Sequence, residues 1–575
     1  MPDLVLRDAT IVDGTGAPAF AGDVAVTDGR IAAIGRVDGA AAREIACDGR
    51  VVCPGFVDLH THYDAQLLWD GTASPSPLHG VTTVLGGNCG FSIAPLGDDD
   101  ADYVRRMMAV VEGIPLAALE AGAAWNWRSF GDYLDRLDGA VAPNVGIMVG
   151  HSTLRRVVMG DAATREVATD DQLATMVALL ERSLAEGGLG FSSSLGEGHL
   201  DGDGRPVPSS SADFREIVAL AGALRDHPGT TLEFIPTVGP IAAERMQLMA
   251  DMSLAADRPL NWNLLGSLAS HEIYEEQLEA SDLAASLGAH VVALTLPDVM
   301  RLRSSTVLEG IPGWHDVMVR DEAARRATVA DPAARADLRS AAVRTAERSL
   351  GALGDFGLME VADADSPLVG IPLGEVARRR GTDVVDVLLD VVLVEGLTLS
   401  TVLPSLVPSL GRSDEGWARR VEVWRDPRVL LGGSDAGAHL DLMCHANYPA
   451  VVLGEVVRDR GLLSIEEAVA MMTDRPARLY GLRGRGQVRA GWCADLVVFD
   501  PALVATEPAE LRHDLPGGAP RLHATARGIG HVLVNGVEVA HGGVMTDSRP
   551  GTVLRSGRDT ETVTLADVRR SRPRR

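Results

Sequence analysis

Two histidines stand one residue apart at the end of an apolar run. The run is VVCPGFVDL, from Val51 to Leu59, and His60, Thr61 and His62 follow it. Side chains of a β-strand alternate between its two faces, so His60 and His62 point the same way if the run is a strand. Two imidazoles at that spacing can share one metal ion, and the pair therefore predicts a metal site.

Other residues that bind metals or move protons follow later apolar runs. Cys89 lies in an Asn-Cys-Gly segment, and Asp435 lies in the segment GGSDAGAH. Donors of the His, Cys and carboxylate types suit Zn²⁺, which polarises a carbonyl group and lowers the pKa of a bound water to about 7. Asp435 is then the predicted base, which takes the proton of the water and passes it to the leaving nitrogen of an amide. A helix cap is the other interpretation of Asp435. Further residues expected in this pocket are His151, Glu233, Asn263 and His439.

Eight strand-like runs place these residues. Helical patterns lie between most of the runs, so the sequence predicts an α/β protein with a (β/α)₈ TIM barrel, whose active site lies at the carboxyl ends of the strands. An open doubly wound sheet is the alternative, but no glycine-rich phosphate loop follows the first strand. The runs cover residues 51–60, 80–90, 143–153, 188–196, 230–236, 259–266, 290–297 and 428–437.

Short β patterns occur at both ends of the chain, in residues 3–50 and again from Cys493 onward. They predict one small β-sandwich domain built from residues 1–54 and 483–560, a barrel over residues 55–482, and a C-terminal tail over residues 561–575. An Arg- and Ala-rich helical excursion at about residues 301–348 follows the seventh strand. It is expected to be either a lid over the active site or a peripheral decoration.

The composition of the chain limits the kinds of partner that we expect it to bind. The chain has 575 residues and a net charge of −26, which disfavours nucleic acid and anionic membrane surfaces. The five cysteines form no close pair, no signal peptide begins the chain, and no apolar run reaches the roughly 18 residues of a membrane helix. We expect a soluble, cytoplasmic protein that acts on a small molecule, with homo-oligomerisation left open. All 53 basic residues are arginine, so the chain has no lysine.

The motifs PGFVDLHTHYD and the late Ser-Asp, on a barrel with a split terminal domain, resemble the amidohydrolase superfamily. The segments GVTTVLGGNCGFSIAPL and NVGIMVGHSTLR resemble its D-aminoacylase (N-acyl-D-amino-acid deacylase) group in particular. The resemblance implies metal-ligand roles for His60, His62, Cys89 and Asp435, and a catalytic pocket role for His151.

The chain departs from that group at the fifth and sixth strands. The group usually supplies a histidine from each, whereas LEFIPTVG and LNWNLL contain none, and Glu233 and Asn263 stand there. Glu233 could replace a histidine as an oxygen ligand. Without lysine, the carboxylated lysine that bridges two metals in hydantoinases and dihydroorotases is excluded. We therefore expect one Zn²⁺ ion held by His60, His62, Asp435 and one more ligand.

The predicted function is hydrolysis of a linear amide, in an N-acyl-(D-)amino acid or an aminoacyl conjugate. The alternatives are a tailoring amidase that removes an aminoacyl group from a larger metabolite, a mononuclear deaminase, and a non-catalytic barrel. Asn263 and His439 are expected to bind substrate. A substrate carboxylate would need an arginine, for which Arg155, Arg301 and Arg303 are the predicted choices.

Overall fold

The computed structural model describes most of the chain. The described residues are 1–237, 239–263, 265, 271–298, 301–303, 308, 311–346, 356–361, 366–368, 371–395, 399–402 and 413–571, without the side chains of residues 271–273, 301–303, 358, 399–402 and 571. Among the described residues, no helix is both long enough and apolar enough to span a membrane.

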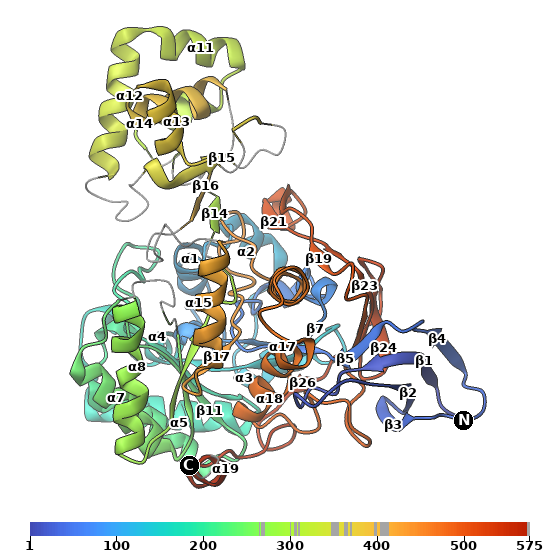
Figure 1. Cartoon of the computed structure of the whole chain (residues 1–575). Coiled ribbons are helices and arrows are strands. Elements are labelled where there is room, and N and C mark those ends of the chain that lie inside the picture. The colour runs from blue at the N-terminus through green and yellow to red at the C-terminus, as the bar shows by residue number, and fades with distance from the viewer. Residues whose placement is uncertain are drawn as a thin grey trace.

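A barrel of parallel strands forms the centre of the molecule, which confirms the predicted fold class (Figure 1). Each of the eight predicted runs contains one barrel strand, and the third is interrupted at Met148. The barrel closes between its last and first strands, where the Asp435 N–H donates to the His60 carbonyl at 3.0 Å and the His62 N–H donates to the Ala436 carbonyl at 2.7 Å. The strands are β6 (Phe56–Asp58), β7 (Val81–Gly86), β8 (Asn144–Ile147) with β9 (Val149–Gly150), β10 (Gly190–Ser194), β11 (Thr231–Ile235), β12 (Leu260–Trp262), β13 (Val291–Thr295) and β17 (Val429–Leu431).

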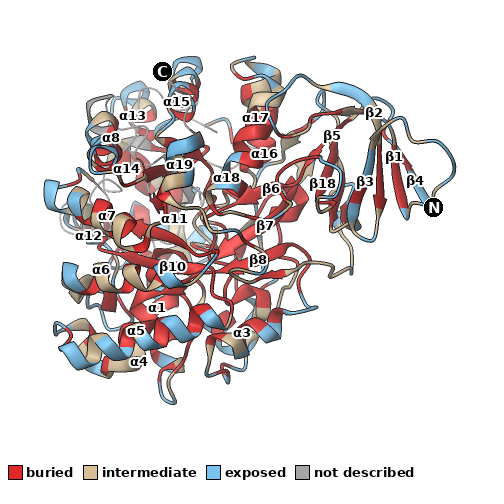
Figure 2. Ribbon diagram, turned by 90° about the horizontal axis from the view of Figure 1, so that it is seen from below, coloured by how far each residue is buried: buried red, intermediate tan, exposed pale blue. Residues whose placement is uncertain are grey.

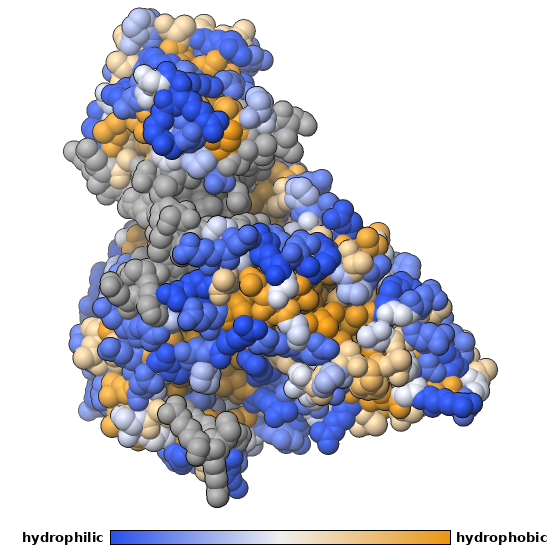
Figure 3. Space-filling view, viewed as in Figure 1, coloured by the Kyte–Doolittle hydropathy of each residue, from blue (hydrophilic) through white to orange (hydrophobic). Residues whose placement is uncertain are grey.

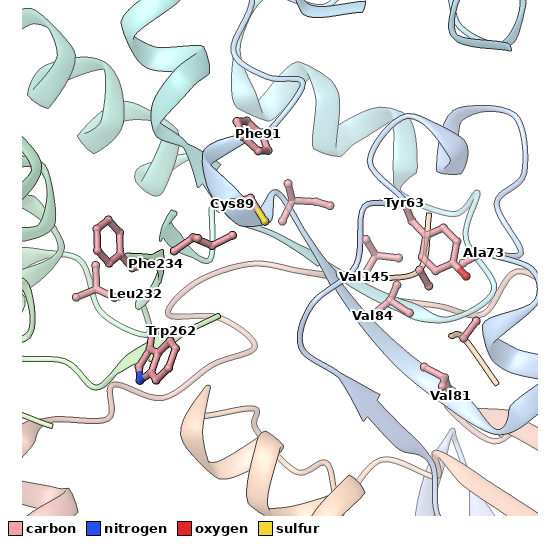
Figure 4. Packing of buried hydrophobic residues seen from close by; sticks show 14 of the residues in the cluster. Tyr63, Ala73, Val81, Val84, Cys89, Phe91, Val145, Leu232, Phe234 and Trp262 are labelled. Carbon is pink, nitrogen blue, oxygen red and sulfur yellow. The ribbon is translucent and has the colours of Figure 1, made fainter. Parts of the chain in front are cut away.

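Helices cover the outside of the barrel and leave its strands buried (Figure 2). Their starts are fixed by side chains: Thr169 and Gln172 form a capping box at the first turn of α5 (Asp170–Ala185). Apolar side chains of neighbouring strands, among them Phe234 of β11 and Trp262 of β12, belong to one large buried core (Figure 4). The other covering helices include α4 (His151–Met159), α6 (Phe214–Ala223), α7 (Ala243–Ala256), α8 (His271–Ser286), α15 (Asp414–Arg425), α17 (Ile465–Met472) and α18 (Asp474–Leu479).

One nine-stranded sheet combines strands from both ends of the chain, which confirms a β domain built from the two termini. The first apolar run is divided at Gly55: Val51–Pro54 pairs inside this sheet, and the barrel strand begins at Phe56. A Cβ at Gly55 would lie 2.0 Å from the Thr82 hydroxyl, so only glycine fits there. The strands are β1 (Leu4–Ile11), β2 (Phe20–Thr27), β3 (Arg30–Gly35), β4 (Arg43–Ala46), β5 (Val51–Pro54), β18 (Leu496–Phe499), β23 (Ile529–Val534), β24 (Val537–His541) and β25 (Val544–Met545).

Two of the predicted boundaries need correction. β26 (Val553–Leu554) pairs with barrel strand β8, so the β domain does not extend to residue 560. The excursion after the seventh strand also runs past residue 348, because β14 (Arg301–Arg303) pairs with β16 (Leu399–Val402) and the chain returns only after Val402. The helical pattern of residues 373–394 resembles a barrel helix in sequence, and strand pairing is needed to assign it.

The excursion forms a lobe with a hydrophobic core of its own. Trp314 and Leu338 are buried in that core together with Met359 and Leu389. Figure 1 shows the lobe standing clear of the barrel, and Figure 3 shows many hydrophilic residues on the visible faces of both. Its elements include α10 (Trp314–Met318), α11 (Glu322–Ala330), α12 (Pro332–Thr345), β15 (Met359–Val361), α13 (Leu373–Arg380) and α14 (Val384–Leu388).

Candidate metal centre

The histidine pair lies just beyond the carboxyl end of β6. The Nε2 atoms of His60 and His62 are 3.2 Å apart, and both side chains are buried. The backbone hydrogen bonds of the barrel closure hold this segment against the chain after β17. The two rings therefore direct the same nitrogen to one point.

Asp435 reaches that point from the other side of the closure. Its Oδ1 lies 3.0 Å from Nε2 of His62 and 3.5 Å from Nε2 of His60. The turn that presents it, with Asp435 at φ 58°, is held by Asp58, which accepts hydrogen bonds from the Ser434 N–H at 3.1 Å and the Ser434 hydroxyl at 2.5 Å. Burial raises the pKa of Asp435, but hydrogen bonds from His60 and His62 outweigh it and hold the pKa well below its usual range.

Cys89 completes the cluster from the end of β7. Its Sγ lies 3.3 Å from Nε2 of His60 and 3.8 Å from Nε2 of His62. Cys89 adopts φ 57°, which is uncommon for a residue with a side chain, and its N–H donates to Oε2 of Glu233 at 2.9 Å. This backbone conformation places the thiol beside the two histidines.

The spacing of these donors can be compared with that of a zinc site. Zn–N and Zn–O bonds of about 2.0–2.1 Å in a tetrahedron separate two such donors by about 3.3 Å, and a Zn–S bond of about 2.3 Å separates sulfur from nitrogen by about 3.6 Å. The separations of the two histidine nitrogens from each other, from the Cys89 sulfur and from the Asp435 oxygen range from 3.0 to 3.8 Å. His60, His62 and Cys89 form one group of donors within 4.8 Å of one another, and His62, Glu112 and Asp435 form a second.

Glu112 is a site residue that the sequence did not reveal. It follows α1 (Ala101–Val111), and its buried Oε1 lies 3.3 Å from Nδ1 of His62. Burial, together with the charges of Asp435, Asp64 and Glu233, raises its pKa well above the usual range. No apolar run or motif marks Glu112, because it lies in the connection after a helix rather than at the end of a strand.

Glu233 approaches His60 at Nδ1, whereas Cys89 and Asp435 approach it at Nε2. Its Oε1 is 3.9 Å from Nδ1 of His60 and accepts a hydrogen bond from the amide of Asn263, while its Oε2 accepts the Cys89 N–H. Burial raises the pKa of Glu233 to about 7. The predicted ligand role is therefore corrected: Glu233 supports His60 and Cys89 from behind and does not join the donors at Nε2.

His151 and Arg155 also need correction. The two nitrogens of His151 contact the Ser193 hydroxyl at 2.8 Å and Oε1 of Glu216 at 2.7 Å. Arg155 is fully buried and pairs with Oε2 of Glu216 at 2.5 Å. Both residues thus belong to a buried network outside the cavity, and neither is available to a substrate. The side chains of Arg301 and Arg303 lie outside the described residues.

A cavity of about 120 Å³ opens onto the cluster. Asn263 and His439 line it as predicted for substrate contacts, and His199 lines it without having been predicted. None of the lining residues that the structure describes is an arginine. The lining residues are His60, His62, Cys89, Val111, Glu112, His199, Ile235, Asn263, Leu294, Leu296, Gly433, Asp435 and His439.

Comparisons with known proteins give relatives over nearly the whole chain. D-aminoacylase from Alcaligenes xylosoxydans xylosoxydans is 31% identical over 561 residues, which cover 96% of this chain and 97% of the relative. N-acyl-D-aspartate deacylase from the same organism is 30% identical, with 96% of this chain and 95% of the relative covered. A solved D-aminoacylase structure, described as having a binuclear metal center, aligns with a TM-score of 0.63 and 28% identity over 96% of this chain and 100% of that chain. The profile of the Amidohydrolase family matches residues 43–540, and the chain therefore belongs to the amidohydrolase family.

Proposed function

We propose that this protein hydrolyses the amide bond of an N-acyl-D-amino acid with one Zn²⁺ ion bound by His60, His62, Cys89 and Asp435. The observation that carries the proposal is that the His60 and His62 nitrogens, which line a cavity, lie 3.3–3.8 Å from the Cys89 sulfur and 3.0–3.5 Å from Oδ1 of Asp435. The match to D-aminoacylase covers 97% of that protein's length and supports the choice of reaction. The number of ions is part of the proposal, because the related structure is described as binuclear.

The residues of the site divide the chemistry between them. A bound Zn²⁺ supplies a Lewis acid and lowers the pKa of water to about 7. Asp435 takes a proton from the attacking water and delivers it to the leaving nitrogen. Glu112 and Glu233 place carboxylate oxygens 3.3 Å and 3.9 Å from the Nδ1 atoms of His62 and His60, which have no hydrogen-bond partner, so they act on the two rings through their charge.

The apolar wall of the cavity suggests the shape of the substrate. Val111, Ile235, Leu294 and Leu296 line it opposite the donors. An acyl chain or an apolar amino-acid side chain would bury its surface there, at about 25 cal/mol per Å². We therefore expect N-acyl derivatives of small apolar amino acids to be better substrates than those of charged ones.

A second candidate is a tailoring amidase that acts on an aminoacyl conjugate. Its support is the absence of arginine from the described lining of the cavity, in a chain without lysine. A free amino-acid carboxylate needs a cationic partner when it leaves water, whereas a capped carboxyl group does not. This candidate predicts that an amino-acid amide or ester is cleaved faster than the free acid.

The test is hydrolysis of matched N-acetyl-D- and N-acetyl-L-amino acids and their amides by zinc-loaded protein, followed by mass spectrometry. Asp435→Asn should lower kcat by about 10²–10⁴-fold, the usual contribution of a general base. Asp171→Asn, on the exposed surface of α5, is the matched control. An Asp435→Asn protein with the wild-type rate would refute the mechanism, and release of ammonia from a heterocycle alone would favour the deaminase alternative. Failure of every substrate would favour the non-catalytic barrel.

Three further expectations stay predictions. They are a cytoplasmic location, the lack of nucleic-acid and membrane partners, and the oligomeric state, which the sequence leaves open. Gel filtration with light scattering measures the last directly.

A further inference from the structure

A second cluster of metal-binding side chains lies in the β domain, away from the barrel. His531 on β23 pairs with His541 on β24 across a hairpin whose turn is Asn535-Gly536, both with positive φ. Their Nδ1 atoms are 3.1 Å apart. Glu538, also on β24, places Oε1 2.6 Å from Nδ1 of His531 and 3.2 Å from Nδ1 of His541.

A β-bulge explains why three ligands share one face. Glu538 and His541 are three residues apart and would point to opposite faces of a regular strand. The register of the hairpin shifts between Val532 and Leu533, so that β24 has one extra residue there. Val539 and Ala540 are consequently both buried, and Glu538 and His541 emerge on the same face.

The cluster is poorly satisfied by protons alone. If Nδ1 of both histidines carried a proton for Glu538, two N–H groups would face each other at 3.1 Å. If only one is protonated, its single N–H must serve both the Glu538 carboxylate and the other nitrogen. A cation at the centre of the triangle would satisfy all three atoms at once.

The distances suit a transition-metal ion. The three separations of 2.6–3.2 Å lie at or below the roughly 3.3 Å edge of a tetrahedral zinc site. The second oxygen of Glu538 is held by Arg43 at 2.5 Å, which fixes the carboxylate. Two imidazoles with an arginine beside the single carboxylate do not suit Mg²⁺ or Ca²⁺, which prefer several oxygen ligands.

We propose that His531, Glu538 and His541 form a second binding site for a divalent transition-metal ion, with Zn²⁺ as its probe, independent of the barrel centre. The site is open to solvent, since 62% of the His541 side chain is exposed. A fourth position is thereby left for water. A metal count of two per chain would then not by itself mean a binuclear active site.

The test is a zinc titration of chelator-treated protein in competition with a chromophoric chelator. Wild-type protein should bind one ion more per chain than His541→Ala, and Glu538→Gln should lose the same ion. His513→Ala removes an exposed histidine of the same half of the chain and should bind as wild type does. The barrel ions are common to all four proteins, so the difference does not depend on the proposed hydrolase activity.

Equal zinc binding by wild type and His541→Ala would overturn the proposal. Because Glu538 also holds Arg43, its variant is accepted only if its thermal midpoint in chelator matches that of wild type. His541 is exposed, so His541→Ala should fold normally and remains the deciding variant. A difference between wild type and His541→Ala that persists after barrel variant Cys89→Ala is introduced into both would support two independent sites.

Discussion

Glu233→Gln tests whether this carboxylate is a metal ligand or supports one. The substitution preserves the shape of the side chain and removes its charge 3.9 Å from Nδ1 of His60. The new amide can still accept the Cys89 N–H with its oxygen and donate to Asn263, whose own Oδ1 has no hydrogen bond. Folding stability should therefore change by no more than about 1 kcal/mol, the net value of one hydrogen bond.

The expected effect falls on the metal instead. Loss of a carboxylate behind a ligating histidine usually costs 10- to 100-fold in metal affinity, or about 1.4–2.8 kcal/mol. Zinc affinity of Glu233→Gln is measured by chelator competition, and Glu181→Gln, on the exposed face of α5, is the control. Unchanged affinity would refute the supporting role. Loss of the ion altogether, with normal folding in chelator, would show instead that Glu233 is a ligand.

Three more predictions follow from buried contacts. Glu112→Gln should weaken zinc binding about 10- to 100-fold, as Glu112 faces Nδ1 of His62; chelator competition measures it, and wild-type affinity would count against the role. Ser434→Ala should cost about 1–3 kcal/mol in urea unfolding because Asp58 loses a buried donor; a change below the error of the measurement would contradict this. Burial lowers the pKa of His79 from 6.5 to about 4. Below pH 6.5 the unfolded chain therefore binds a proton that the folded protein refuses, which costs about 2 kcal/mol between pH 7.5 and pH 5. His79→Gln keeps a donor for the Ala524 carbonyl and should lose about that much less on acidification; an equal loss in both proteins would refute the assignment.

The sequence predicted the barrel because its strands are buried on both faces. Such strands are near-continuous apolar runs, and polar residues follow them only where the barrel opens. The pattern did not reveal where one run changes sheet. Val51–Pro54 and Phe56–Asp58 look like one strand, yet they pair in different sheets on either side of Gly55. Only pairing partners distant in the chain distinguish the two.

A residue that follows a barrel strand is expected to lie at the carboxyl end of the barrel. Its place in the sequence does not predict the direction in which its side chain points. His151 follows β9 as His60 follows β6, but His151 begins α4, and its ring is held by Ser193 and Glu216. The direction of the ring depends on the first turn of the chain after the strand. That turn is set by contacts with α6, which the local sequence of β9 does not contain.

The directions of the side chains also bear on how many metal ions the barrel binds. Both Nδ1 atoms of the histidine pair face carboxylates, Glu233 and Glu112, while both Nε2 atoms face Asp435 and Cys89. Glu233 also accepts a hydrogen bond from Asn263, so the two positions where the D-aminoacylase group usually carries histidines are bonded to each other here. A second ion in the barrel would take its ligands from His62, Glu112 and Asp435, whose donor atoms lie within 4.8 Å of one another. Glu112, with its raised pKa, would first have to give up a proton to do so. We therefore propose one tightly held ion in the barrel.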